Sequence, residues 1–327
     1  MRTSPDRTID ISVVVICYNQ ERTVAAALDS VLTQTARDRI GEIFVVDDCS
    51  TDGTLAVARA MAARHPGITV IAREANSGGC AAPRNDGILR AAGTHVALLD
   101  GDDTWHPDKI ATQIAALEAC PGIGLLYSDF VTFDALTGQE TRGTANHHAA
   151  TDADQLRRFF IHGGPVLPSC AVLSRAAIEA AGLFDATMPF NEDSEYWLRV
   201  AAVAPIHHQP LPLLRKRTWY GSLGSEKYGL ENLACKAEIT RRMVRIVPGL
   251  ADAVPAREAR IAYKTALHFF ATGDRAAARQ QLRRCLGLDP TLGKARLALA
   301  LSYMASDPGA ALHRARGLWA RRPLALR

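Results

Sequence analysis

The 327-residue chain lacks the features that mark several classes of protein. Its seven cysteines are odd in number and scattered, and no Cys-x-x-Cys pair occurs. The sequence therefore predicts neither a disulfide framework nor a zinc site, and it suits a reducing compartment. No apolar run approaches the ~18 residues that a membrane span requires. The N-terminus has no apolar signal region before its first strand-like segment, so we expect no signal peptide and a cytoplasmic protein.

Two common nucleotide-binding motifs are also missing. No Gly-x-Gly-x-x-Gly follows the first apolar segment, and no G-x-x-x-x-G-K-[ST] loop occurs anywhere. A simple Rossmann or P-loop protein is therefore disfavoured. Apolar residues make up 48% of the chain and charged residues 22%, which is typical of a folded globular protein with one large domain or two ordinary ones.

The first part of the chain contains a regular alternation of strand and helix patterns. Continuous apolar runs predict buried strands at residues 12–17, 42–47, 68–72 and 95–99. Apolar residues spaced by three and four predict helices between them. This alternation favours a mostly parallel α/β sheet with right-handed connections. After Leu126 the pattern weakens: we expect a polar loop over 134–155, a strand at 170–173, a helix at 193–203 and a mobile loop over 211–229.

The last hundred residues are rich in Ala and Arg, and their pattern predicts helices. Ala266 and Phe269 recur 34 residues later as Ala300 and Tyr303, which resembles one tetratricopeptide-type repeat and the start of a second. We therefore expect two domains, 1–229 and 230–327. Residues 1–214 hold 16 basic and 26 acidic residues, whereas residues 215–327 hold 22 and 8. The basic half is either a solvated helical surface or a region attracted to anionic membrane or an anionic substrate.

Three acidic clusters follow apolar segments. The richest holds Asp100, Asp102 and Asp103 directly after a strand, where ligands bind in α/β sheets. Carboxylates this close repel one another and indicate a cation such as Mg²⁺ or Mn²⁺, although a helix-capping cluster is the alternative. The other clusters are at 47–48, which also suits capping, and at 191–195, which precedes an amphipathic helix.

Five segments, in order, resemble the motifs of family 2 glycosyltransferases, which have the GT-A fold and invert the anomeric configuration. They are Ser12–Thr35, Glu42–Thr54, Asn76–Asp86, Leu98–Lys109 and Gly182–Ala201. Each motif is degenerate, but all five in order make the match specific. The resemblance implies a GT-A nucleotide-binding sandwich, in which helices flank a mostly parallel sheet, followed by an α-helical C-terminal region.

The resemblance also implies residue roles. Asp193, beside Glu192, would be the general base that deprotonates the acceptor hydroxyl. Asp103 would be the direct metal ligand, with Asp102 beside it. The donor would be bound by Cys17, Tyr18, Asn19, Asp48, Arg84, Asp100 and Asp102, with Tyr18 and Asp48 near the base. A loop holding Arg215, Arg217 and Ser222 would close over the diphosphate, although a plain surface position suits these three residues equally well.

The implied reaction moves a hexosyl or N-acetylhexosaminyl group from a nucleotide-diphosphate donor, most simply a UDP-sugar, with Mn²⁺ or Mg²⁺. The implied acceptor is a glycan or lipid-linked hydroxyl in surface polysaccharide synthesis, and no nucleic acid partner is expected. Two departures from the family pattern stand out. Cys17 occupies a position where a hydroxyl is usual, and Cys49 replaces a turn glycine, so the local backbone there is uncertain.

Two rival interpretations remain from the sequence. Residues 100–104 match the D-x-D-x-T motif of haloacid dehalogenase phosphatases, but about a hundred residues precede them and no lysine lies between Lys109 and Lys216. A scaffold that binds nucleotide-sugar without turnover is the second rival. The pairs His147-His148 and His207-His208 are expected in loops or at the surface, Trp197 in packing, and Trp105 either in packing or on the acceptor side.

Overall fold

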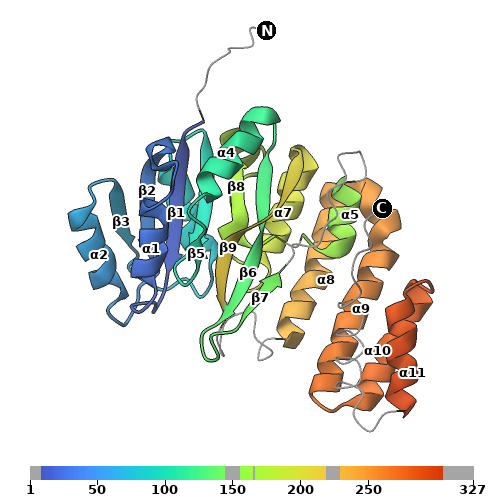
Figure 1. Ribbon diagram of the computed structural model, residues 1–327. Helices are drawn as coiled ribbons and strands as arrows, with labels where there is room; N and C mark the ends of the chain where they lie inside the picture. Colours follow the sequence, from blue (N-terminus) through green and yellow to red (C-terminus); the bar gives the residue numbers. More distant parts are fainter. Residues whose placement is uncertain (1–8, 144–154, 165, 219–228, 305–327) are drawn as a thin grey trace, which may run out of the picture. The chain divides into compact units, whose positions relative to one another are not determined.

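The computed structural model describes residues 9–143, 155–164, 166–218 and 229–304 (Figure 1). The chain forms two compact units. The first comprises residues 1–159 and 164–222, and the second comprises residues 160–163 and 223–327.

The described part of the first unit contains one nine-stranded sheet in the order β3-β2-β1-β4-β8-β6-β9-β5, with β7 paired to β6. The strands are β1 (Ile11–Cys17), β2 (Ile40–Asp47), β3 (Ile68–Ala72), β4 (His95–Asp100), β5 (Thr104–Trp105), β6 (Leu125–Asp134), β7 (Glu140–Gly143), β8 (Ala171–Ser174) and β9 (Ile206–Thr218). β3, β2, β1 and β4 run parallel, β8 is antiparallel to β4 and β6, and β9 is parallel to β6. The expected α/β class with a mostly parallel sheet is confirmed.

Among the described residues, seven helices lie between these strands along the chain. They are α1 (Val24–Leu32), α2 (Thr54–Arg64), α3 (Ala81–Arg90), α4 (Lys109–Ala119), α5 (Gln155–His162), α6 (Arg175–Ala181) and α7 (Glu192–Val203), with short 3-10 turns at Arg37–Arg39 and Pro168–Cys170. α1 and α2 connect strands in one direction along the sheet and α3 connects in the other, so right-handed crossovers place α3 on the opposite face.

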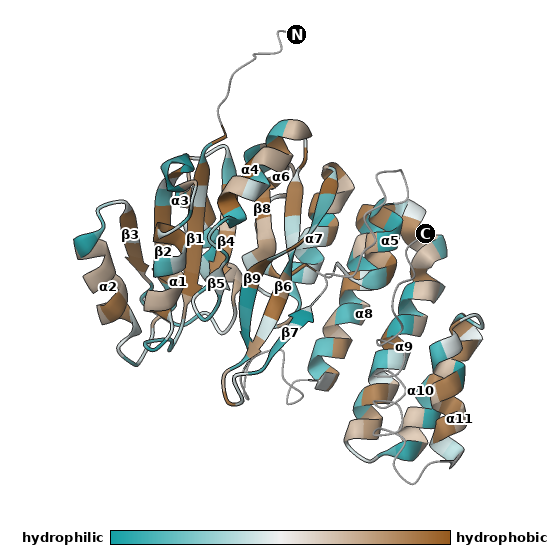
Figure 2. Ribbon diagram, viewed as in Figure 1, coloured by the Kyte–Doolittle hydropathy of each residue, from teal (hydrophilic) through white to brown (hydrophobic). Residues whose placement is uncertain are grey.

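β1 lies between β2 and β4 within the parallel strands of the sheet. All seven of its residues are buried, and Figure 2 draws the strand in hydrophobic colours. Such a run is buried on both faces because helices pack above and below it. On one face, a Cβ at Gly87 of α3 would lie 2.3 Å from Cγ1 of Val14, so glycine allows α3 to approach the strand closely.

The sequence prediction was wrong for residues 211–218, which form the end of β9 rather than a mobile loop. β9 pairs with β6 from Leu125↔Ile206 to Asp134↔Thr218, and β6 itself was not predicted as a strand. Pro210 and Pro212 lie where the register shifts, which is where a sheet tolerates proline. Residues 219–228 of the predicted loop lie outside the described residues.

The second unit is helical, as expected. It contains α8 (Gly229–Ile246), a 3-10 segment (Pro248–Ala253), α9 (Val254–Ala271), α10 (Arg275–Leu288) and α11 (Gly293–Met304). Small buried residues such as Ala262, Ala266 and Ala278 form much of its core. Gly273 has φ +85°, and the Asp274 side chain accepts a hydrogen bond from the Ala277 N–H at 2.9 Å, which starts α10. None of the helices in the described residues has the length and apolar content to cross a membrane.

Candidate functional site

The ends of β1, β2 and β4 lie side by side. Cys17 pairs with Asp47, and Ile16 pairs with Asp100, so the loops that follow these strands emerge at one edge of the sheet. This is the edge at which parallel α/β sheets bind ligands.

The loops after β1 and β2 are tied together by hydrogen bonds. The Oδ1 atom of Asn19 accepts from the Thr51 N–H at 2.8 Å, and Oε2 of Glu21 accepts from the Gly53 N–H at 2.9 Å. The Gln20 N–H donates to Oγ1 of Thr54 at 2.6 Å. Asn19 has φ +51°, a left-handed conformation that asparagine tolerates. The two loops therefore form one cross-linked structure.

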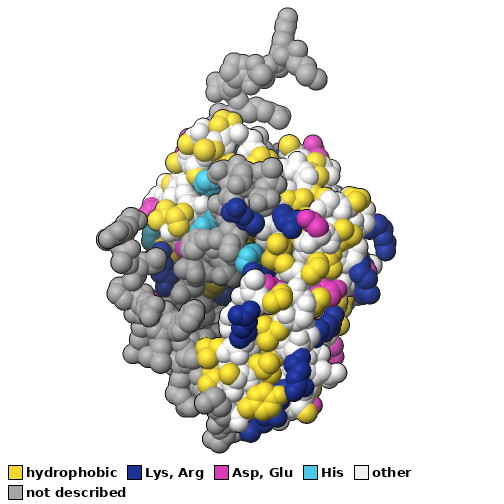
Figure 3. All heavy atoms as spheres, turned by 90° about the vertical axis from the view of Figure 1, so that its right-hand side faces the viewer, with side chains coloured by type: hydrophobic (Ala, Val, Ile, Leu, Met, Phe, Trp, Pro, Cys, Tyr) yellow, Lys and Arg dark blue, Asp and Glu magenta, His cyan; other side chains and the backbone are white. Residues whose placement is uncertain are grey.

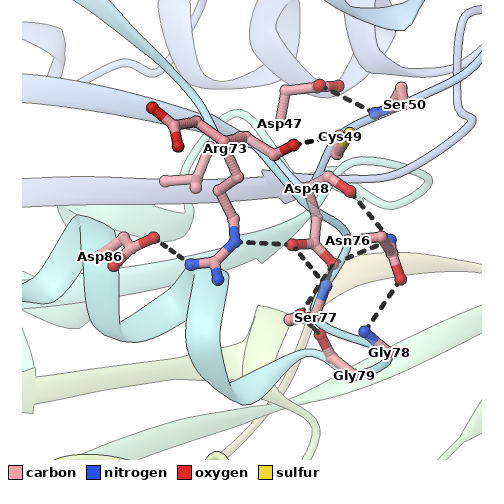
Figure 4. A network of polar contacts seen from close by, with 12 residues as sticks. Asp47, Asp48, Cys49, Ser50, Arg73, Asn76, Ser77, Gly78, Gly79 and Asp86 are labelled. Atoms are coloured by element: carbon pink, nitrogen blue, oxygen red, sulfur yellow. Dashed lines mark hydrogen bonds and ion pairs between the residues drawn. The ribbon is translucent and has the colours of Figure 1, made fainter.

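Asp48 is the hub of the network in Figure 4. Its side chain is buried and forms an ion pair with Nε of Arg73 at 2.8 Å. It also accepts hydrogen bonds from Oγ of Ser77 at 2.8 Å and from Nδ2 of Asn76 at 3.0 Å. Arg73 pairs in addition with Asp86. The carboxylate expected near a nucleotide base is thus already engaged by protein donors, and it holds the segment after β3 against the β2 loop.

Cys17 at the end of β1, Tyr18 in the loop after it and Cys49 in the β2 loop have different local environments. Cys17 was expected to bind the donor, but its side chain is only 3% exposed and its Sγ lies 3.6 Å from the Val46 carbonyl oxygen. Burial, followed by the Asp47 charge, raises the pKa of its thiol. Tyr18 is 45% exposed and remains open to a ligand. Cys49 has φ +60°, so it adopts the left-handed conformation that the family's glycine would occupy without strain.

The β4 loop separates its carboxylates. Asp103 was expected to be the direct metal ligand, but it is 4% exposed. Its Oδ2 accepts from Oγ of Ser169 at 2.8 Å, and its Oδ1 accepts from the Arg217 N–H at 3.0 Å. Burial, followed by the charges of Asp100 and Asp102, raises its pKa to about 8. Asp103 is therefore a buried group that attaches the loop to β9 and to the Ser169 turn.

Asp102 instead lines a cavity of about 280 Å³. The other lining residues are Asn19, Gln20, Glu21, Arg22, Thr23, Asp52 and Arg217. Gly101 is required beside it, because a Cβ there would lie 2.5 Å from Oε1 of Gln20 and 3.0 Å from Cβ of Cys17. That Gln20 oxygen is buried and has no hydrogen-bond donor among the described residues.

Arg84 connects two of the acidic clusters. It is 3% exposed, and its guanidinium donates to Oδ1 of Asp100 at 2.9 Å and to Oε1 of Glu192 at 2.8 Å. Its guanidinium carbon lies 5.6 Å from the centre of the Phe184 ring. The arginine expected near the nucleotide therefore joins the end of β4 to the start of α7.

The first turn of α7 brings Glu192 and Asp193 to this region. Asp193 is half-buried, and its Oδ1 accepts from the Ser194 N–H at 2.6 Å. The Cys80 thiol, at the start of α3, lies within the field of these groups. Its pKa is raised to about 12, chiefly by burial; Arg84 opposes the rise, and the charges of Asp100, Glu192 and Asp193 contribute to it. Charges from the end of β4 and the start of α7 thus act on one thiol.

Ser169 is a site residue that the sequence analysis missed. Its Oγ accepts from the Asp100 N–H at 3.0 Å and donates to Asp103, and its carbonyl oxygen accepts from Nε1 of Trp105 at 2.9 Å. No local motif marks this serine, because its partners lie more than 60 residues away. Trp105 is consequently buried and packs, which settles the choice between packing and lining the acceptor side.

The other residues singled out in the sequence analysis lie away from the cavity or outside the described residues. Arg215 is exposed, pairs with Oε1 of Glu140 at 2.6 Å and stacks 3.7 Å from the Phe133 ring centre. Ser222 and the pair His147-His148 lie outside the described residues. The expectation of a loop or surface position was wrong for His208, which is buried on β9 with its Nε2 2.9 Å from Oδ1 of Asp129. Trp197 is fully buried, as expected.

The described residues contain no group of three or more His, Cys, Asp or Glu side chains that could hold a metal by themselves. They do offer Asp102 at the cavity with Asp100 two residues before it. Mg²⁺ and related ions are commonly held by one or two carboxylates together with substrate phosphates. The site therefore fits an ion shared with a bound diphosphate.

The sequence profile described as Glycosyl transferase family 2 matches residues 12–181, which is more than half of the chain. The chain therefore belongs to glycosyl transferase family 2, and its fold is the GT-A fold of glycosyltransferases.

Known proteins agree with this assignment. The chain is 41% identical over 93 residues to a poly(ribitol-phosphate) beta-glucosyltransferase of Bacillus spizizenii, covering 28% of this chain and 15% of that protein. It matches between 15% and 39% of the length of the first curated relatives. TarS 1-349 of S. aureus in complex with UDP-GlcNAc has a TM-score of 0.62 at 18% identity, covering 95% of this chain and 92% of that one. The mannosyltransferase PcManGT of Pyrobaculum calidifontis, in complex with GDP-Man and Mn²⁺, has a TM-score of 0.58, covering 98% and 82%.

Proposed function

We propose that this glycosyltransferase moves a hexosyl or N-acetylhexosaminyl group from a nucleotide-diphosphate donor to a hydroxyl of a glycan or lipid-linked acceptor in surface polysaccharide synthesis. A UDP-sugar is the favoured donor, in line with the ligand of the similar TarS structure. The glycan acceptor is in line with the poly(ribitol-phosphate) substrate in the relative's name. We assign catalysis to residues 1–229 and treat residues 230–327 as a helical extension.

The placement of Asp102 at the cavity is the observation that carries the proposal. We assign the metal contact to Asp102 with Asp100, in place of the buried Asp103. Mn²⁺ or Mg²⁺ would stabilise the negative charge that develops on the leaving diphosphate. Tyr18 and Asn19 would contact the nucleotide from the β1 loop, and Arg217 would face the diphosphate from the cavity wall.

Asp193 is the proposed general base. It takes the proton of the acceptor hydroxyl while that oxygen attacks the anomeric carbon. The bond between the anomeric carbon and the diphosphate oxygen breaks on the opposite face, so the configuration inverts. Glu192 is held by Arg84 and orients the first turn of α7 that carries Asp193.

The basic C-terminal half is proposed to contact anionic membrane from the cytoplasmic side, where a lipid-linked acceptor would be located. Vesicle flotation at low and high salt tests this contact, because screened surface charges lose their attraction at high salt. Absence of binding to anionic vesicles at low salt would contradict it.

Calorimetry with UDP, GDP, CDP and dTDP, each with and without Mn²⁺, tests the donor proposal. We expect one nucleotide to bind wild-type protein only with metal, and Asp102→Asn to abolish that binding. Asp103→Asn is the matched control, and it should retain binding because Asp103 is turned away from the cavity. If no nucleotide binds under any metal condition, the transferase proposal loses its support and a non-catalytic scaffold becomes the better description.

A further inference from the structure

Three cations form a line in the second unit and have no acidic partner among the residues that the structure describes. Arg257, Arg260 and Lys264 are spaced by three and four residues on α9, so they share one face of the helix. Within the described residues, no carboxylate pairs with any of them. Neighbouring arginines differ: Arg241 pairs with Glu238 at 2.7 Å, and Arg284 pairs with Glu258 at 3.2 Å.

Arg257 is the buried member of this line. It is 2% exposed, its Nε donates to Oγ1 of Thr240 at 2.7 Å, and it also donates to the Phe160 carbonyl oxygen. Its guanidinium carbon lies 4.7 Å from the centre of the Phe160 ring. All of these partners are uncharged, so no described residue neutralises the positive charge of Arg257, and its burial lowers its pKa to about 10.

The other two members of the line add to this excess of charge. The Nε of Arg260 is buried and has no hydrogen-bond acceptor among the described residues. Desolvation of its ammonium group, followed by the charges of Arg257 and Arg260, lowers the pKa of Lys264. Unpaired buried donors and uncompensated charges destabilise a folded protein. An anion bound on this face would remove both costs.

We infer that α9 carries a binding site for a phosphate group, which Arg260 and Lys264 contact directly and Arg257 supports electrostatically. Guanidinium groups bind phosphate oxygens through paired hydrogen bonds, and an unpaired Nε–H is one donor of such a pair. The phosphate could belong to a soluble compound or to a lipid headgroup, since both present the same oxygens. On the face drawn in Figure 3, Lys and Arg side chains lie among hydrophobic ones. The α9 line differs from a plain surface cluster because Arg257 is buried.

The test uses the full chain and the double variant Arg260→Gln/Lys264→Gln. Arg257 is left in place because it bonds Thr240 and Phe160. The matched control is Arg245→Gln/Arg283→Gln, which removes the same charge from α8 and α10. Inorganic phosphate and pyrophosphate are titrated by calorimetry in EDTA, so that metal-dependent binding at the donor site does not contribute. We expect saturable binding to wild type, at least tenfold weaker binding to the double variant, and a change within twofold in the control.

A second arm separates the two phosphate sources. Binding to phosphatidylglycerol vesicles, but not to phosphatidylcholine vesicles or inorganic phosphate, with the same loss in the double variant, supports the site with a headgroup as its ligand.

Melting temperatures give an independent check: without phosphate the double variant should be at least as stable as wild type, because a repulsion has been removed. The inference is overturned if neither arm shows saturable binding, or if the control loses as much as the double variant, since general surface charge would then explain the result. Asp102→Asn should bind phosphate normally, which separates this site from the donor site.

Discussion

The loops that follow β2 and β4 have similar acidic sequences but place their carboxylates differently. In the β2 loop, Asp48 is buried and engaged by Arg73, Asn76 and Ser77. In the β4 loop only Asp103 is buried in this way, and Asp102 lines the cavity. Two acidic clusters at strand ends thus place their carboxylates differently: one is engaged within the protein, and the other brings a carboxylate to the cavity wall.

The largest effect should come from Asp102→Asn. Loss of the carboxylate proposed to hold the metal, whose charge would stabilise the leaving diphosphate, should lower kcat by about 10²–10³-fold. The free energy of unfolding should not fall, because the substitution relieves repulsion from Asp100 and Asp103. Parallel turnover and urea-unfolding measurements check both points. An Asp102→Asn variant that loses stability but keeps turnover would give Asp102 a structural role like that of Asp48 and Asp103. The difference described between the β2 and β4 loops would then be wrong.

Asp48→Ala should lower stability more than turnover, which is the opposite of the result expected for Asp102→Asn. Removing a buried carboxylate that joins three donors should lower the free energy of unfolding by about 3 kcal/mol, because the donors lose their shared acceptor. Donor binding should weaken only as the β2 loop loosens. Thermal unfolding with and without the bound nucleotide measures this. Unchanged stability would show that the network in Figure 4 is not structural.

Lys109→Met tests what supports the β4 loop. Lys109 is fully buried beneath Trp105, with its Nζ 4.2 Å from the ring centre, and burial lowers its pKa to about 7. Between pH 7 and 10.5 the unfolded chain therefore binds one more proton than the folded chain, so wild-type stability rises with pH in that window. Methionine removes this rise, and the variant should be more stable than wild type by about 2 kcal/mol at pH 6. Unfolding at pH 6, 8 and 10 would show the gap narrowing, and a constant gap would contradict the explanation.

The smallest effect is expected for Cys49→Gly, which relaxes the β2 loop. Cys49 has φ +60°, and glycine adopts this conformation without a Cβ clash. The variant should gain about 1 kcal/mol of stability with turnover unchanged. Cys49→Ala is the control: it keeps a Cβ at the same φ and should show no gain. Equal midpoints for the two variants in urea would remove backbone strain as the cause.

The parallel half of the sheet could be predicted from the sequence, because β1, β2, β3 and β4 are apolar runs that need no distant partner to be recognised. β6 and β9 could not, since their outer halves are only partly buried and depend on pairing with each other across about 80 residues.

The chemistry of the site was predictable only at the level of the motifs. The three carboxylates of the β4 loop look equivalent in sequence, and the distinction between Asp102 and Asp103 is made by Ser169 and Arg217 from elsewhere in the chain. The same holds for Arg84, whose two carboxylate partners lie 16 and 108 residues away.

The Arg84 bridge has a consequence for attempts to redesign this enzyme. Its two ion pairs, with Asp100 and with Glu192, link the end of β4 directly to the start of α7. Segments grafted from another transferase to change the acceptor would have to bring a carboxylate to the position of Glu192. A graft without it would leave half of a buried guanidinium unpaired and would loosen its contact with Asp100 at the end of β4.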